Sequence, residues 1–153
     1  MKQSLKKILT IILAEDDEGH ALLIKRNIKR SGIVNEIVHL RNGEEVLNYF
    51  LCKPEGKQPK KNYIILLDIK MPKIDGIEVL EKLKKNKKTR DIPIIMISTT
   101  DNPREIEKCH SLGCSSYIVK PIDYQHFIDT VSDLGYTLKI NKDHNHTNYY
   151  ESR

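Results

Sequence analysis

Residues 63–67 read Tyr-Ile-Ile-Leu-Leu, and Asp68 follows them directly. Two other stretches of the chain, 8–14 and 94–97, are also apolar at nearly every position. Strands with this pattern are covered on both faces, as they are in parallel sheets. We therefore predict that these three runs form the central strands of a parallel sheet. The weaker runs 36–40 and 116–119 are predicted to be edge strands or short strands.

Segments with helical spacing separate the predicted strands, and several begin with a capping residue. The first predicted helix carries the apolar stripe Ala21, Leu22, Ile24 and Ile28 and ends near Gly32, and the second runs from the cap Asn42 to about Cys52. The third is marked by Ile77, Leu80 and Leu83, and the fourth runs from Asp101-Asn102-Pro103 to near Gly113. The fifth is capped by Asp123 and carries Phe127, Ile128, Val131 and Leu134. This βαβαβαβαβα alternation indicates an α/β fold, an open parallel sheet with helices on both faces.

Length and composition narrow the class of protein. The chain has 153 residues, which favours one domain. Its longest apolar stretch, 8–14, is far shorter than the roughly 20 residues that span a bilayer, so we expect no membrane association. A basic start before that stretch resembles a signal peptide, but the acidic run 15–18 follows at once, and we predict a buried strand instead.

Cysteine content favours a cytoplasmic protein, and the net charge does not favour a nucleic-acid partner. Lys and Arg number 26 against 21 Asp and Glu, a net charge of +5 that is too mild to indicate nucleic-acid binding. Cys52, Cys109 and Cys114 are an odd number without a C-x-x-C pair, which is typical of reduced thiols in the cytoplasm. His20, His39, His110 and His126 are scattered, and we interpret them as ordinary residues without a site role.

Chemically active residues follow the predicted strands. Glu15-Asp16 ends the first strand, Asp68 the third, Ser98-Thr99 the fourth and Lys120-Pro121 the fifth. In open α/β sheets, ligands bind outside the carboxyl ends of the strands. We therefore expect three carboxylates, a hydroxyl and an ammonium to meet at one edge of the sheet.

Three carboxylates in one pocket repel each other, so either one is protonated or a cation neutralises them. Mg²⁺ suits a site made of oxygen ligands and water, whereas the absence of His and Cys at the strand ends argues against zinc. An aspartate can also act as a nucleophile and form an aspartyl phosphate. In that reaction Lys120 could supply a second cation and Ser98 a hydrogen-bond donor to the transferred group.

The motifs as a set resemble the receiver domains of two-component response regulators, over about residues 7–140. The matching segments are Leu13-Ala14-Glu15-Asp16-Asp17, Leu66-Leu67-Asp68-Ile69-Lys70-Met71-Pro72-Lys73-Ile74-Asp75-Gly76, Pro93-Ile94-Ile95-Met96-Ile97-Ser98-Thr99 and Tyr117-Ile118-Val119-Lys120-Pro121. The resemblance implies a flavodoxin-like, doubly wound sheet of five strands in the order 2-1-3-4-5 with five helices. It also implies a cis bond between Lys120 and Pro121.

The resemblance implies a role for each matching residue. Asp68 is the expected phosphoacceptor, Ser98 the switch hydroxyl, Tyr117 the switch aromatic that turns inward on activation, and Lys120 the phosphate-binding lysine. The expected Mg²⁺ ligands are Asp16 and Asp68 directly, Glu15 through water, and Lys70 through its backbone carbonyl.

The resemblance also implies partners. A sensor histidine kinase would supply the phosphoryl group, and a downstream signalling protein would read the surface of the fourth helix, fifth strand and fifth helix. The long polar loop 53–62 resembles the small single-domain regulators that serve bacterial phytochrome-type histidine kinases. The apolar fifth helix predicts a homodimer strengthened by phosphorylation. We expect residues 141–153, which lack apolar periodicity, to be a mobile tail.

Two other functions are open at this stage. The first is a Mg²⁺-dependent aspartyl-phosphate phosphatase; enzymes of the haloacid dehalogenase type carry a second Asp two residues past the nucleophile, where this chain has Lys70. The second is a nucleic-acid-binding regulator, although no helix-turn-helix pattern follows residue 140.

Overall fold

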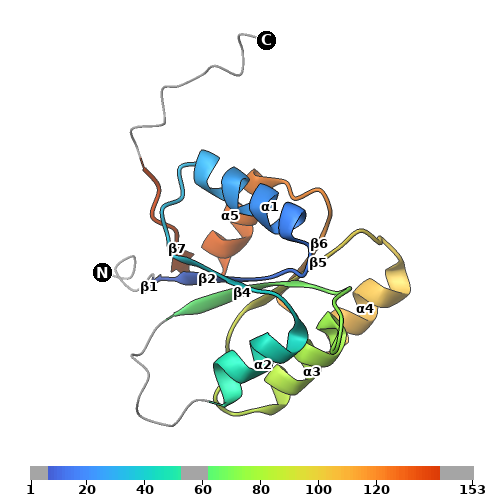
Figure 1. The fold of residues 1–153 in the computed structure, drawn as a ribbon. Coiled ribbons are helices and arrows are strands. Elements are labelled where there is room, and N and C mark those ends of the chain that lie inside the picture. Colours follow the sequence, from blue (N-terminus) through green and yellow to red (C-terminus); the bar gives the residue numbers. More distant parts are fainter. Residues whose placement is uncertain (1–6, 53–61, 142–153) are drawn as a thin grey trace.

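The computed structural model describes residues 7–52 and 62–141, in which a central parallel sheet lies between two layers of helices (Figure 1). The five strands of this sheet are Thr10–Ala14 (β2), Ile37–Leu40 (β3), Tyr63–Asp68 (β4), Ile94–Ser98 (β5) and Ser116–Val119 (β6). Their order is β3-β2-β4-β5-β6, and all neighbours are parallel. Numbered among themselves, these strands run 2-1-3-4-5, which confirms the predicted α/β fold.

Five helices cover the sheet in the described part of the chain. They are Glu18–Arg30 (α1), Gly43–Leu51 (α2), Gly76–Lys85 (α3), Pro103–Ser111 (α4) and Tyr124–Asp133 (α5). Figure 1 shows α1 and α5 on one face of the sheet and α2, α3 and α4 on the other. None of these helices is both long and apolar enough to cross a bilayer.

The predicted capping residues begin their helices. Asn42 Oδ1 accepts a hydrogen bond from Glu45 N at 2.8 Å, and Asn102 Oδ1 accepts one from Arg104 N at 2.9 Å. Asp123 caps α5 in the same way. Each cap satisfies backbone N–H groups that have no partner inside the helix.

The hydrophobic core lies in two layers because successive strand residues point to opposite faces. On β2, Ile12 and Ala14 pack in the layer under α2, α3 and α4, while Ile11 and Leu13 pack in the layer under α1 and α5. All five residues of β2 are buried, as the apolar run predicted. The carboxyl ends of these strands are therefore held rigidly.

The predicted strand 8–14 is interrupted, which differs from the sequence prediction. Lys7–Ile8 (β1) pairs in parallel with Tyr136–Thr137 (β7) in a separate two-stranded sheet, while β2 joins the main sheet. The partner changes at Leu9, whose carbonyl accepts a hydrogen bond from the Asn35 side chain at 2.8 Å. A two-residue strand such as β7 has no periodicity from which it could be predicted.

Residues 136–141, which we call the C-terminal strap, run from β7 past the turn between α1 and β3. Val34 N donates to Lys139 O at 2.7 Å, Asn141 N donates to Gly32 O, and Ile33 forms an antiparallel bridge with Ile140. The loop 53–61 and the tail 142–153 lie outside the described residues.

Candidate functional site

Three carboxylates meet at the carboxyl end of the sheet. Ala14 pairs with Leu67 across β2 and β4, so Glu15 and Asp16 emerge beside Asp68, the last residue of β4. One oxygen from each of the three side chains lies within 4.8 Å of the others. Glu15 and Asp68 are buried, and Asp16 is exposed. The predicted acidic cluster is thus assembled by the register of two neighbouring strands.

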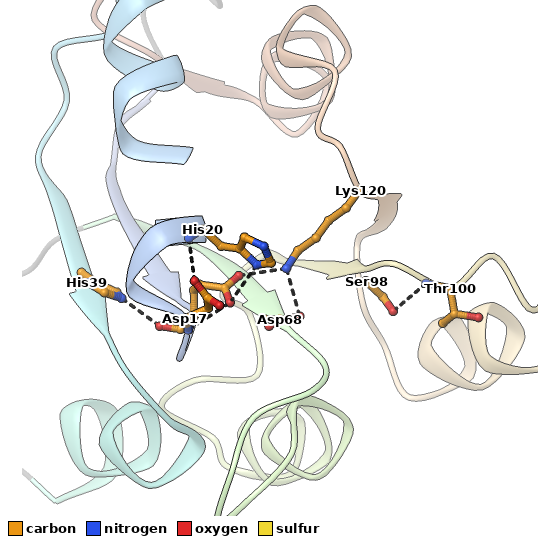
Figure 2. A network of polar contacts seen from close by, with 8 residues as sticks. Asp17, His20, His39, Asp68, Ser98, Thr100 and Lys120 are labelled. Atoms are coloured by element: carbon orange, nitrogen blue, oxygen red, sulfur yellow. Dashed lines mark hydrogen bonds and ion pairs between the residues drawn. The ribbon is translucent and has the colours of Figure 1, made fainter. Parts of the chain in front are cut away.

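Lys120 extends into this cluster from the end of the edge strand β6. It follows β6 and precedes a cis peptide bond to Pro121, as predicted. Its Nζ lies 3.0 Å from Glu15 Oε1 and 3.6 Å from Asp68 Oδ1 (Figure 2). The side chain is only 15% exposed, so little water screens the ammonium from the carboxylates.

The cluster raises the pKa of Asp68 to about 7. Burial is the largest cause, the negative charge of Glu15 adds to it, and the Lys120 ammonium opposes it. A single ammonium therefore does not compensate three carboxylates. This is the situation in which a protein either holds a proton or binds a cation.

The donor set suits a hard divalent cation. All three side chains offer carboxylate oxygens, and one of them, Asp16, is open to solvent. Mg²⁺ prefers oxygen ligands and keeps several water molecules, which matches a cluster with one exposed side. The residues present therefore fit the ion predicted from sequence.

The loop after β4 holds Asp68 through a close approach of backbone. Gly76, the first residue of α3, donates its N–H to Ile69 O at 2.8 Å. A Cβ atom at position 76 would lie 2.3 Å from Asp68 O, closer than two such atoms can approach, so only glycine fits here. Within this loop Lys70 is exposed. It also borders the same cavity as Asp68.

Ser98 lies at the end of β5, beside this cluster (Figure 2). Its Oγ accepts a hydrogen bond from Thr100 N at 3.1 Å. Ser98 is buried yet borders the cavity of about 210 Å³ that also contacts the acidic residues. The residues that line it are Glu15, Asp16, Asp17, His20, Asp68, Lys70, Ser98, Thr99 and Lys120.

Tyr117 does not line this cavity. Its hydroxyl lies 3.0 Å from Thr100 O and 2.7 Å from Glu105 Oε1, so its one proton can serve either acceptor in turn. Burial raises the pKa of Tyr117 to about 12, so the hydroxyl stays protonated and remains a donor. The tyrosine therefore links β6 to the loop before α4 rather than to the carboxylates.

Two histidines that the sequence analysis set aside lie at the site. His20 Nδ1 is 3.9 Å from Glu15 Oε2, and His39 Nε2 is 2.8 Å from Glu15 O. The interpretation of both residues as ordinary did not anticipate that they lie next to Glu15. His20 lies in the first turn of α1, directly after the end of β2, so its position near Glu15 could have been inferred from sequence. His39 comes from β3, and only the register with β2 brings it to Glu15.

Known proteins resemble this chain over most of its length. A model of the family described as "Response regulator receiver domain" matches residues 11–132. The probable methanogenesis regulatory protein FilR2 of Methanothrix harundinacea is 34% identical over 124 residues, which cover 81% of this chain and 79% of FilR2. The response regulator Rcp1 of Synechocystis sp. is 30% identical over 110 residues, 72% of this chain and 75% of Rcp1.

Solved structures of response regulators are also similar to this chain. The bacteriophytochrome response regulator RtBRR is 30% identical with a TM-score of 0.72, covering 85% of this chain and 80% of its own. The bacteriophytochrome response regulator AtBRR is 28% identical with a TM-score of 0.74, covering 86% of this chain and 95% of its own. The fold, the motifs and the family match coincide, and we conclude that this chain belongs to the response regulator receiver domain family.

Proposed function

We propose that Asp68 accepts a phosphoryl group from a sensor histidine kinase and that this modification switches a surface read by a downstream signalling protein. The observation that carries the proposal is the Lys120 ammonium, 3.6 Å from Asp68 Oδ1 within a cluster of three carboxylates. The membership of the receiver family supports it. Neither the phosphatase nor the nucleic-acid alternative gains support from the comparisons.

Asp16 and Asp68 would hold Mg²⁺ directly, Glu15 through water, and Lys70 through its backbone carbonyl. The ion would neutralise negative charge on the transferred group and favour the ionised form of Asp68. These four positions line the same cavity. We propose the metal ligands on that ground together with the oxygen chemistry of the cluster.

The chain's own residues supply the remaining parts of phosphoryl transfer. A carboxylate oxygen of Asp68 forms a bond to phosphorus while the bond from phosphorus to the kinase imidazole breaks, and that nitrogen keeps the electron pair. Lys120 exchanges part of its contact with Asp68 for a phosphoryl oxygen. The Ser98 hydroxyl keeps its own proton to donate to another phosphoryl oxygen while its Oγ accepts from Thr100 N, and we propose that it moves toward the phosphoryl group as this bond forms.

That movement provides the route to the partner surface. Ser98 and Tyr117 both contact Thr100, one through its N–H and the other through its carbonyl. A shift of Ser98 toward the phosphoryl group therefore alters the loop that holds the Tyr117 hydroxyl. We propose that Tyr117 then turns inward and biases the surface formed by α4, β6 and α5 toward its partner-binding state.

A groove beside the site offers a place for the kinase. It measures about 330 Å³ and borders the phosphoacceptor cavity through His20, Thr99 and Lys120. Its apolar wall is formed by Leu23, Ile24, Ile122 and Tyr124. A kinase must bring its phosphohistidine to Asp68, so its docking surface must lie next to this cavity. The similarity to bacteriophytochrome regulators favours a phytochrome-type kinase.

We propose that the receiver domain spans residues 7–140 and acts in the cytoplasm. The C-terminal strap supports a domain end close to residue 140, because its hydrogen bonds with the turn before β3 continue to Asn141, the first residue of the tail that the sequence predicts. Three free thiols, two of them buried, are typical of a reducing compartment.

Incubation with acetyl phosphate and Mg²⁺ tests the phosphoacceptor. We expect intact-mass measurement to show one added phosphoryl group in the wild type and none in Asp68→Asn. Asp133→Asn, a change at an exposed carboxylate at the end of α5, is the matched control and keeps the wild-type mass shift. Equal labelling of Asp68→Asn and the wild type would overturn the assignment.

A further inference from the structure

The carbonyl that joins Glu15 to Asp16 has an unusual partner. The last ladder bond between β2 and β3 runs from Glu15 N to Leu40 O at 3.0 Å. The next acceptor along the chain, Glu15 O, receives no strand N–H and instead lies 2.8 Å from His39 Nε2. A side chain of β3 thus extends the ladder by one hydrogen bond, at the point where the chain leaves the sheet.

The chemistry of this contact identifies which ring nitrogen carries a hydrogen. A carbonyl only accepts hydrogen bonds, so Nε2 must be the donor. The other ring nitrogen, Nδ1, is buried and has no hydrogen-bond partner among the described residues. Leaving a buried polar atom unpaired costs free energy. The ring nevertheless adopts this orientation, in which the hydrogen bond from Nε2 to Glu15 O is kept.

The peptide held by His39 connects two of the three acidic residues. Asp17, which follows them, caps α1 by accepting from His20 N at 2.9 Å. Only Glu15 and Asp16 lie between the last ladder bond and the cap. The orientation of the peptide that joins them therefore sets the starting positions of both of their side chains. Figure 2 shows His39 approaching from β3, across the acidic residues from Lys120.

We infer that His39 is a positioning residue, whose hydrogen bond to the Glu15 carbonyl orients the Glu15-Asp16 pair for binding a divalent cation. This inference rests on the proposed function, since it presupposes a metal site at Glu15, Asp16 and Asp68. His39 does not line the cavity that would receive the ion and the phosphoryl group. It acts on the ligands through the backbone, as outer-shell residues do in other metal sites.

Calorimetric titration of Mg²⁺ into the purified full chain tests the inference. Loss of an outer-shell hydrogen bond typically weakens metal affinity about 10- to 100-fold. We expect His39→Leu, which fills the space without a donor, to bind Mg²⁺ about tenfold more weakly than the wild type. His39→Gln places an amide N–H at the same reach from the backbone, and we expect it to restore most of the affinity.

Controls separate positioning from folding. His126→Leu removes an exposed histidine on α5 and should bind Mg²⁺ as the wild type does. Urea unfolding of each variant shows whether it is folded; if His39→Leu is not, His39→Asn replaces it, because its shorter amide cannot reach Glu15 O. Equal affinity of the donor-free variant and the wild type, or no rescue by His39→Gln, would overturn the inference.

The failure of the metal site itself gives a different result. Asp16→Asn removes a proposed ligand and should lose most of the Mg²⁺ affinity. If Asp16→Asn binds Mg²⁺ like the wild type, the proposed site is wrong and the role of His39 falls with it. If Asp16→Asn loses the ion while His39→Leu keeps it, only the role of His39 is wrong.

Discussion

Buried polar groups at the two ends of the sheet differ in how fully their charges and hydrogen bonds are compensated. At the carboxyl end, Glu15 and Asp68 are buried with one ammonium between them, and the pKa of Asp68 is raised to about 7. At the amino end, Asn35 is equally buried, but its amide donates to Leu9 O and its carbonyl accepts from Lys139 N. The carboxyl end therefore holds buried charges that are not fully compensated, whereas the buried polar groups at the amino end are satisfied by hydrogen bonds.

This contrast indicates which part of the molecule acts and which part stabilises. Charges that are poorly compensated in the metal-free protein lower its stability, and proteins retain such groups where a ligand will complete them. A buried amide with both of its groups paired is a structural feature. Changes at the two ends should therefore separate stability from phosphorylation.

The largest expected effect on stability is at the amino end. Asn35→Ala removes the buried hydrogen bond to Leu9 O and the partly buried one from Lys139 N. It should lower the free energy of unfolding by about 3 kcal/mol, the upper end for two bonds that each contribute roughly 0.5–1.5 kcal/mol. Urea unfolding measures the change. Phosphorylation by acetyl phosphate should be retained, because no residue of the acidic cluster is touched.

Asn62→Ala is the matched control for Asn35→Ala. Its amide donates to Ile8 O at 3.3 Å in an exposed setting, and we expect a loss below about 1 kcal/mol. If Asn35→Ala cost no more than Asn62→Ala, the amino end would not be the stabilising end.

At the carboxyl end, removing a charge should stabilise the metal-free protein. The pKa of Asp68 is about 7 in the folded chain, above its value in the unfolded chain. A raised folded pKa gives stability at low pH that is lost as the pH rises toward and through 7. The two pKa values differ by about three, which sets an upper limit of about 4 kcal/mol, since one pKa unit corresponds to about 1.4 kcal/mol. The buried Asn amide gives back part of this gain because it needs hydrogen bonds of its own, so Asp68→Asn should exceed the wild type by roughly 2 kcal/mol at pH 8.

Urea unfolding in a chelating buffer at pH 5 and at pH 8 checks this prediction. The advantage of Asp68→Asn should shrink toward pH 5, where wild-type Asp68 is protonated in the fold. Saturating Mg²⁺ should stabilise the wild type more than the variant. A variant less stable than the wild type at pH 8 would show that the carboxyl end is not under electrostatic strain.

A smaller effect is expected at Lys70. Its side chain borders the Asp68 cavity, so its ammonium can pair with a phosphoryl oxygen and obstruct the water that hydrolyses the aspartyl phosphate. Such a pair is worth about 1 kcal/mol at 4 Å in water. We expect Lys70→Ala to lose its phosphoryl group about fivefold faster, since about 1.4 kcal/mol is tenfold in rate.

The half-life of the phosphorylated protein in saturating Mg²⁺ measures this effect. Lys73→Ala is the control, because Lys73 pairs with Glu44 at 3.1 Å and does not line the cavity. A longer half-life in Lys70→Ala would overturn the argument, and an unchanged one would make Lys70 an ordinary surface residue.

The smallest expected effect concerns the phosphorylation-enhanced dimer. Phe127 and Val131 of α5 are buried in the core, and Ile128 and Leu134 pack against it, so the helix leaves little apolar surface for a second copy. Val119 on the neighbouring strand is 38% exposed. Coupling between two events is typically about 5- to 150-fold, and we expect the lower end of that range.

Sedimentation velocity over a series of protein concentrations, with and without acetyl phosphate, measures this coupling. Asp68→Asn is the control that cannot be phosphorylated, and Val119→Lys should abolish any larger species. A phosphorylated wild type that stays monomeric at high concentration would contradict the prediction of a dimer.

The architecture and the composition of the acidic cluster can be predicted from patterns within the chain. Three apolar runs indicated strands buried on both faces, caps such as Asn42 and Asp123 located helix starts, and a parallel sheet necessarily gathers Glu15, Asp68 and Lys120 at one edge. These features are local or follow from topology, so a single chain displays them.

The contacts between individual groups could not be predicted in this way. The division of the first strand at Leu9 depends on Asn35, which is 26 residues away, and β7 is too short to show a pattern. The contact of His39 with Glu15 depends on the register of β2 and β3, because a slip of one residue would turn the histidine to the opposite face. Register and side-chain reach are set by packing between distant segments, which no local pattern records.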